Sequence, residues 1–226
     1  MKTCHFIILF LLTPILWSQQ SDAQNLRYFE DQFYIGLSYN ALLERPQGVS
    51  QRSLSYGLQG GFIKDIPLNR KRTFALGIGA GYGINSYYSN LVASTDNGAI
   101  QYEINTDIEG FRRSKVETHS LEFPIELRWR NSNPQDYKFW RIYPGIRMAY
   151  TFSSRSKLAT DSGKDAFQND DLRSFQYGAM INLGYNTFNL HVYYGLNSLF
   201  NDDVRTVDGT ELGMKPLRLG LIFYIL

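Results

Sequence analysis

Cysteine is almost absent from this chain, because only Cys4 among its 226 residues carries a thiol. Cys4 precedes the first apolar stretch, in a segment that we expect to be removed, so neither disulfides nor thiol chemistry supports the fold. An excess of one charge is also missing, since 23 basic residues oppose 21 acidic ones and leave a net charge of +2. So small an excess gives no case for a nucleic-acid partner, and we predict none.

Long hydrophobic runs are missing as well. After the first twenty residues no apolar stretch is long enough for a membrane-spanning helix, and the mean hydropathy is −0.29. The side chains nevertheless alternate between apolar and polar over long segments. Transmembrane β-barrels combine these properties, because half of each strand faces a polar interior. The aromatic content of 15%, with 16 Tyr and 15 Phe, also suits the aromatic girdles of such barrels.

The N-terminus predicts an exported protein. Lys2 supplies a positive start, residues 6–17 form a short apolar stretch, and Ser21-Asp22-Ala23 matches a small-x-small cleavage site. A cleavage site a few residues earlier is the alternative. We therefore predict a signal peptide over residues 1–23 and one barrel domain over residues 24–226.

The strongest strand pattern is a hairpin over residues 115–153. Its apolar positions are Leu121, Phe123, Ile125, Leu127 and Trp129 in the first limb, and Trp140, Ile142, Pro144, Ile146, Met148, Tyr150 and Phe152 in the second. A period of two places these side chains on one face and the polar ones on the other. Ordinary strands have about 5–6 residues, whereas these limbs approach the roughly 9–11 that cross a bilayer. The hairpin therefore predicts a membrane wall around a polar interior.

The same alternation recurs along the chain and predicts eight strands. They cover residues 33–42, 53–64, 73–87, the two limbs of 115–153, 173–185, 188–199 and 215–226. Long connections, including polar loops at 88–114 and 154–172, alternate with short ones. We therefore predict an all-β fold, an eight-stranded antiparallel up-and-down transmembrane barrel. The chief alternative is a soluble lipocalin-like barrel, which would bury the apolar face inside.

Connections of alternating length also predict the location and orientation. Bacterial outer-membrane barrels have short periplasmic turns and longer extracellular loops, so we expect outer-membrane localisation with both termini in the periplasm. Five aromatic residues fall near the periplasmic rim and predict an interfacial girdle there. They are Trp129, Trp140, Tyr185, Phe188 and Phe223. Outer-membrane lipid and lipopolysaccharide are then the first expected partners.

A cluster of charged side chains is predicted in the barrel interior, which in an eight-stranded barrel is only wide enough for side chains. Its members are Glu122, Glu126, Arg128, Arg141, Arg147 and Arg218. If Trp129 pairs with Trp140, Glu122 lies opposite Arg147 and Glu126 lies diagonal to Arg141. Such pairs compensate one another's desolvation. We predict a structural plug and no open channel; an ion or proton path is the alternative.

Several segments resemble PorT-type barrels of Bacteroidota. They are Lys115-Val116-Glu117, the stretch from Leu121 to Trp129, Tyr143-x-Gly145 and the closing stretch from Gly220 to Leu226. The resemblance implies a small outer-membrane barrel, in some members a component of the type IX protein secretion system. The last strand also resembles the signal that the barrel-assembly machinery reads, although it ends in Leu226 and not in an aromatic residue.

Five other patterns suggest chemistry, and each has a plainer interpretation. The glycines at 77, 79, 81 and 83 have strand spacing with no helix after them, so we expect room for Tyr193 and the arginines and not a phosphate loop. His119 and Ser120 are adjacent and point to opposite faces, so they form no nucleophile–base pair and we predict no enzyme. His191 is expected to be a packed lumen residue.

Two acidic triplets, 169–171 and 201–203, suggest either calcium binding or solvated loops, and the incomplete spacing favours solvated loops. The basic run 69–72 suggests either contact with anionic headgroups or a capped turn. We predict no metal and no cofactor. The expected function is an accessory role in protein secretion through loops and rims, with secretion-system proteins as partners. The alternatives are a surface-interaction barrel and, third, a lipid-modifying enzyme at the rim.

Overall fold

The computed structural model describes residues 32–225 except 52, 97, 105–109 and 132–138, so the predicted signal peptide lies outside the described residues. Eight strands form the barrel: β1 (Gln32–Leu43), β2 (Tyr56–Pro67), β3 (Phe74–Ser89), β6 (Phe111–Arg130), β7 (Trp140–Thr160), β9 (Phe175–Tyr185), β10 (Phe188–Gly195) and β11 (Lys215–Ile225). Three short strands lie outside its wall: β4 (Leu91–Asp96), β5 (Ala99–Ile104) and β8 (Gly163–Gln168). In this part of the chain no helix is long and apolar enough to cross a membrane.

The barrel is closed, as predicted. Each strand pairs with its neighbours in the order β6-β3-β2-β1-β11-β10-β9-β7, and the pairing of β6 with β7 completes the circle. The first and last strands pair antiparallel from Phe33 with Ile225 to Leu43 with Lys215. Closure leaves no free edge in the wall, which is a requirement for a sheet that spans a membrane.

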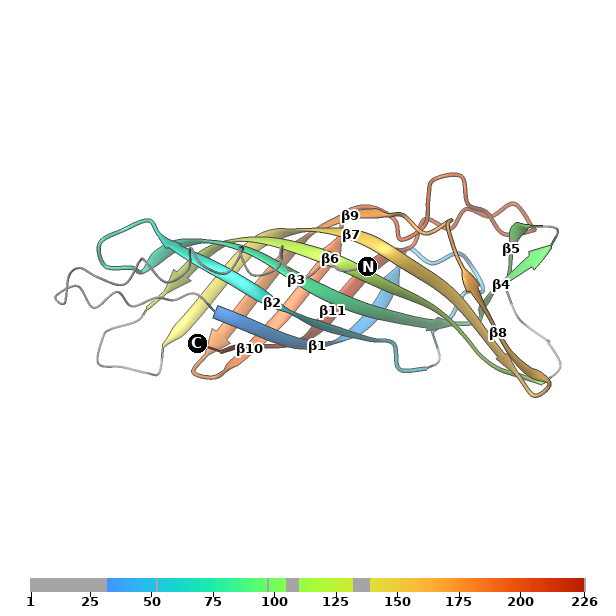
Figure 1. The fold of residues 1–226 in the computed structure, drawn as a ribbon, viewed down its shortest axis with the longest axis horizontal. Helices are drawn as coiled ribbons and strands as arrows, with labels where there is room; N and C mark the ends of the chain where they lie inside the picture. The colour runs from blue at the N-terminus through green and yellow to red at the C-terminus, as the bar shows by residue number, and fades with distance from the viewer. Residues whose placement is uncertain (1–31, 52, 97, 105–109, 132–138, 226) are drawn as a thin grey trace, which may run out of the picture.

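The two ends of the barrel differ in their connections (Figure 1). We call the end with Phe33 and Ile225 the proximal rim, and the other end the distal end. Short connections lie at the proximal rim, including the two-residue turn between β9 and β10. Its Asn186 has φ 54°, a left-handed conformation that asparagine tolerates well. Long connections lie at the distal end, so the predicted alternation of lengths is confirmed.

The distal end has more strand structure than the sequence predicts. The expected loop 88–114 contains the β4–β5 hairpin and the first residues of β6, while the expected loop 154–172 contains the end of β7 and all of β8. The reason is that strands beyond a membrane carry no long lipid-facing row, so the extended alternation that marks the wall strands is absent or short there. Conversely, residues 53–55 and 196–199 lie outside the strands that we predicted to include them.

Side chains sort across the wall as the alternation predicts. Large apolar residues are exposed on the outer surface, for example Leu127 at 60% and Ile146 at 50%. Charged residues on the alternate positions of the same strands are buried, and Glu122, Arg128 and Arg147 are each no more than 1% exposed. This is the arrangement of a wall with lipid outside and a polar interior.

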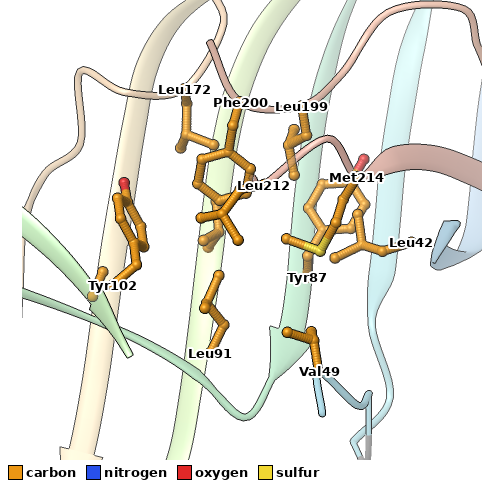
Figure 2. Close-up of a cluster of buried hydrophobic side chains, with 12 residues drawn as sticks. Leu42, Val49, Tyr87, Leu91, Tyr102, Leu172, Leu199, Phe200, Leu212 and Met214 are labelled. Atoms are coloured by element: carbon orange, nitrogen blue, oxygen red, sulfur yellow. The ribbon is translucent and has the colours of Figure 1, made fainter. Parts of the chain in front are cut away.

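A compact apolar core closes the distal end (Figure 2). Its buried residues are Leu42, Val49, Tyr87, Leu91, Ala93, Tyr102, Val116, Leu172, Leu199, Phe200, Leu212 and Met214. The rings of Tyr102 and Phe200 meet edge to face with centroids 5.5 Å apart. Because these residues come from strands and long connections alike, the connections fold as one layer over the barrel.

Two wall strands continue past the barrel, and a third strand pairs with them to extend the same sheet. We call this part the distal extension: residues 111–119 of β6, residues 153–160 of β7, and β8. Its start coincides with a register shift between His119 and Ser120, where one extra β7 residue is accommodated. Such a bulge increases the local twist and bends the strand.

If the outer wall faces lipid, the loss of stability caused by an introduced charge should depend on its depth in the membrane. Ile146 lies opposite Ile125 in the middle of the apolar row of β6, whereas Ile66 lies near the proximal rim. We expect Ile146→Arg to lower the free energy of unfolding by about 2–4 kcal/mol and Ile66→Arg by less than about 1 kcal/mol. Equilibrium urea unfolding in phospholipid vesicles, followed by tryptophan fluorescence, measures both. Equal costs would contradict the assignment of this surface to lipid.

Candidate functional site

The barrel interior contains an ion-pair cluster centred on Glu122. Its two carboxylate oxygens accept hydrogen bonds at 2.9 Å from Nη1 of Arg147 and Nη1 of Arg218. Arg147 also donates to the Gln59 side chain, and both guanidinium groups lie over the ring of Tyr193. Each buried charge is therefore compensated by partners on other strands, which is what burial of a charge requires.

A second cluster lies closer to the proximal rim and is centred on Arg128. Its Nε donates to Glu126 and its Nη1 to Asp65, each at 2.9 Å. The guanidinium also lies over the rings of Tyr143 and Tyr224, with distances of 4.8 Å and 5.4 Å to the ring centroids. The two clusters together fill the lumen with side chains from most of the barrel strands.

Two members of the second cluster were missed by sequence reasoning. Asp65 accepts hydrogen bonds from Arg128 and, at 2.9 Å, from Nη2 of Arg130. The predicted strands ended at Lys64 and Trp129, one residue short of these charges. The period of two continues through both positions, so extending each strand by one residue would have found them.

The predicted pairing across the central hairpin is wrong by two residues. Trp129 lies opposite Ile142, not Trp140, and Glu122 lies opposite Ala149. A shift of two keeps every side chain on its predicted face, so Glu122 still reaches Arg147, but diagonally.

The expected pair of Glu126 and Arg141 does not form. Glu126 bonds to Arg128 and accepts a hydrogen bond from Asn182 at 3.0 Å. Arg141 lies opposite Arg130, with its guanidinium 4.9 Å from the ring centroid of Phe139. The register explains this, because the shift carries Arg141 away from Glu126 and toward the proximal rim.

The glycine run of β3 provides space for the lumen clusters. A Cβ built on Gly77 would lie 2.7 Å from Nε of Arg128, and one on Gly83 would lie 2.6 Å from Oε1 of Glu122. The role expected for Tyr193 is corrected, because that ring packs against Gly178 of β9 instead.

The five aromatic residues predicted as a girdle all lie at the proximal rim. The rings of Trp140 and Tyr185 are 4.9 Å apart, and those of Phe188 and Phe223 are 6.2 Å apart. Trp129 pairs with Phe74 on the neighbouring strand β3.

His119 and Ser120 point to opposite faces, so their side chains do not approach one another. His119 Nδ1 lies 2.5 Å from the Tyr82 hydroxyl on the outer wall, whereas Ser120 is 2% exposed. His191 is buried in the lumen with its Nδ1 2.6 Å from Oδ1 of Asn182. These contacts suit packed, hydrogen-bonded side chains.

The two acidic triplets lie side by side at the distal end but do not converge on a cation site. The backbone N–H of Asn201 donates to the carbonyl of Asp171, and Asp202 pairs with Arg173. Asn169 is fully buried and accepts a hydrogen bond from the Tyr102 hydroxyl at 3.0 Å. Burial raises the pKa of Tyr102 well above its ordinary value, so this hydroxyl stays a donor. Within the described ranges no three His, Cys, Asp or Glu side chains gather as metal ligands would.

The family follows from comparison with known proteins. The model of a family described as outer membrane protein β-barrel domain matches residues 17–201. The chain belongs to this family. It is therefore an outer-membrane β-barrel protein, and nothing in the match is specific to PorT-type members. A search of the curated proteins found no match.

Among solved structures, the barrel is similar to Ail, the attachment invasion locus protein of Yersinia pestis. The identity is 10%, the TM-score is 0.37, and the match covers 86% of this chain and 97% of Ail. A second structure of Ail, in complex with the heparin analogue sucrose octasulfate, gives 11% identity and a TM-score of 0.35 over the same shares of the two chains.

The Glu122 cluster predicts a large cost for removing its carboxylate. We expect Glu122→Gln to lower the free energy of unfolding by about 3–5 kcal/mol, because two buried guanidinium groups lose their counter-charge. The matched control is Glu211→Gln, which breaks an exposed pair with Arg205 and should cost less than about 1 kcal/mol. Urea unfolding in lipid vesicles measures both, and similar values for the two variants would contradict the role of the cluster.

The filled lumen predicts that the barrel does not conduct ions. We expect the purified protein in a planar bilayer to give the conductance of the bare bilayer, since Arg128, Arg147, Tyr193 and their partners occupy the interior. Gly163→Ser, at the start of β8 where a built Cβ meets nothing within 4 Å, leaves the lumen unchanged and serves as a handling control. Stable single-channel steps from the unaltered protein would contradict this expectation.

Proposed function

We propose that this protein is a closed, non-enzymatic outer-membrane barrel whose function lies in contacts made by its distal end at the cell surface. The observation that carries the proposal is the folded distal layer. Solvated loops have no need of a buried core, yet here the long connections share a core with Tyr87, Leu91 and Phe200. A fixed shape at this end is what recognition of another molecule requires.

The membrane orientation in this proposal follows the general pattern of bacterial barrels. Their longer connections face the outside and their short turns face the periplasm. On this pattern the distal extension projects from the cell, and both chain termini are periplasmic.

Two further features support a role in contact and not in transport or catalysis. The lumen holds paired charges in direct contact, which leaves its arginines and carboxylates committed to one another. His119 and Ser120, the candidate pair for lipid chemistry, face opposite sides of the wall. The ends of such a barrel are then the surfaces that make functional contacts.

An accessory role in protein secretion is the second candidate, and the resemblance to PorT-type barrels supports it. The residues that carry the resemblance include Glu126, Arg128 and Tyr143, which meet in the lumen, and Gly145, where a built Cβ would lie 2.2 Å from the carbonyl oxygen of Ile125. These residues therefore contribute to packing inside the barrel. A secretion partner would have to engage a rim, and the proximal run at 69–72 is the corresponding candidate surface.

Trimming the distal extension tests the proposal. We replace residues 157–166 by a two-residue Asn-Gly turn, which retains the barrel strands below the bulge, and express the trimmed chain in a strain that lacks the gene. We expect normal insertion, measured by membrane fractionation and circular dichroism, with loss of complementation of the deletion phenotype.

The control replaces the proximal turn 69–72, and secreted proteins are compared across all strains. Full complementation by the trimmed chain would contradict a distal site of action. A defect restricted to secreted proteins, caused by the proximal replacement, would favour the accessory role in secretion.

A further inference from the structure

The outer face of the distal extension is strongly basic. It carries Arg113 and Lys115 on β6, Arg155 and Lys157 on β7, and Lys164 on β8, with Glu117 as its one carboxylate. The strand register places these side chains together, because directly paired residues point to the same side of a sheet. Lys115 lies opposite Lys157, and Arg113 and Lys164 both lie opposite Ala159.

The opposite face of the same sheet is covered where it borders the distal core. Val116 belongs to the distal core, Phe167 packs against it, and Ser114 Oγ donates to the carbonyl of Leu91 at 2.7 Å. The extension thus has an inner face that packs on the protein and an outer face whose Arg113, Arg155 and Lys164 are exposed.

The positive charge of this face is only partly neutralised. Two like charges directly opposite one another destabilise a sheet, so the pair of Lys115 and Lys157 requires a compensating negative charge. Glu117 lies between them, 2.5 Å from each ammonium nitrogen, and fixes both. Each ammonium keeps further N–H donors. Neither Arg113 nor Arg155 forms a salt bridge with any residue that the structure describes.

The basic face continues the lipid-facing wall without a break. Along β6, the outward residues change from Leu121, 45% exposed, through His119 to Glu117 and Lys115. With a rise of about 3.3 Å per residue and a strand tilt of about 40°, Lys115 lies roughly 15 Å beyond Leu121 along the membrane normal. The cations are therefore at and above the level of the headgroups that border the acyl chains.

We propose that this face binds the phosphate groups of lipopolysaccharide in the outer leaflet. Arg155 and Lys164 are the exposed contacts, half-buried Lys157 lies beside them, and Glu117 positions Lys115 and Lys157. Guanidinium groups bind phosphate through paired N–H donors, and each cation near an anionic lipid surface strengthens binding. Lipid is favoured over a soluble polyanion because the cations stand directly above the surface that contacts acyl chains.

This proposal rests on the proposed function in one respect, namely that the distal extension lies on the outer side of the membrane. Binding in detergent does not depend on that side, so the two proposals fail separately. The variant Lys164→Cys, labelled on intact cells with a membrane-impermeant maleimide, reports the side by itself.

The test compares lipid binding by two variants. The first, R155Q/K157Q/K164Q, removes three cations from the face. The second, K64Q/R70Q/K71Q, removes three from the proximal end and serves as the matched control. Each purified protein, checked by circular dichroism, is labelled and titrated in dodecyl maltoside with bisphosphoryl lipid A. We expect roughly fivefold weaker binding per removed cation in the first variant and no change in the second.

A variant expected to bind more tightly is tested as well, because misfolding could explain weaker binding but not tighter binding. Ala166 is exposed and lies opposite Lys157, and Ala166→Lys should tighten lipid A binding by roughly fivefold. Dephosphorylated lipid A should bind weakly, and inorganic phosphate should not compete at equal concentration.

Unchanged binding by both R155Q/K157Q/K164Q and A166K would overturn the proposal. Equal binding of dephosphorylated lipid A would place the recognition on acyl chains. Competition by inorganic phosphate at equal concentration would identify a general anion site and not a lipid site. Tighter binding of a soluble sulfated polysaccharide than of lipid A would assign the face to a glycan partner. Each of these last three results would also overturn the proposal.

Discussion

Ion pairs across the lumen are the interaction on which the rest of this structure depends. An eight-stranded barrel is too narrow to hydrate charges freely, yet its inward positions carry Glu122, Glu126, Asp65 and several arginines. Glu122 and Asp65 join guanidinium groups from other strands, and Glu126 joins Arg128 of its own strand, which in turn reaches Asp65. The network therefore holds its full set of partners only when the barrel is closed. Removing one partner would leave an uncompensated charge where water cannot reach it.

Because the charged side chains pair in the interior, the outer wall can be apolar. Side chains such as Ile35, Phe123 and Leu127 are exposed because lipid is their solvent, not because the fold leaves them unburied. The glycines of β3 belong to the same arrangement. Long arginine and glutamate side chains fit between the walls only where the facing residues have no Cβ, as at Gly77 and Gly83.

The distal end follows a different rule from the barrel wall. There the chain uses ordinary hydrophobic burial, and a core around Tyr102, Phe200 and Leu212 holds the long connections together (Figure 2). The distal extension lies on this core with one face and leaves its basic face uncovered. A membrane anchor with a filled interior and a shaped, charged surface at one end fits a protein that acts through contact.

The sequence by itself determined the eight-stranded barrel, the sidedness of each wall strand and the identity of most lumen charges. A period of two assigns faces without any knowledge of neighbours, and a sheet that spans a membrane has to close because its edges cannot face lipid. The register across the central hairpin was wrong by two residues, because a shift of two preserves every face and leaves the pattern unchanged. Only the tertiary structure decided which carboxylate meets which arginine.

The tertiary structure also decided the form of the distal end. Strands β4 and β8 show no regular apolar alternation, and that of β5 is limited to Ile100, Tyr102 and Ile104, because neither lipid nor a polar lumen borders these short strands. Basic residues from three strands share one face there only because antiparallel pairing aligns positions up to about fifty residues apart in the chain, as with Arg113 and Lys164. The spacing of these residues along the sequence does not indicate that they share a face.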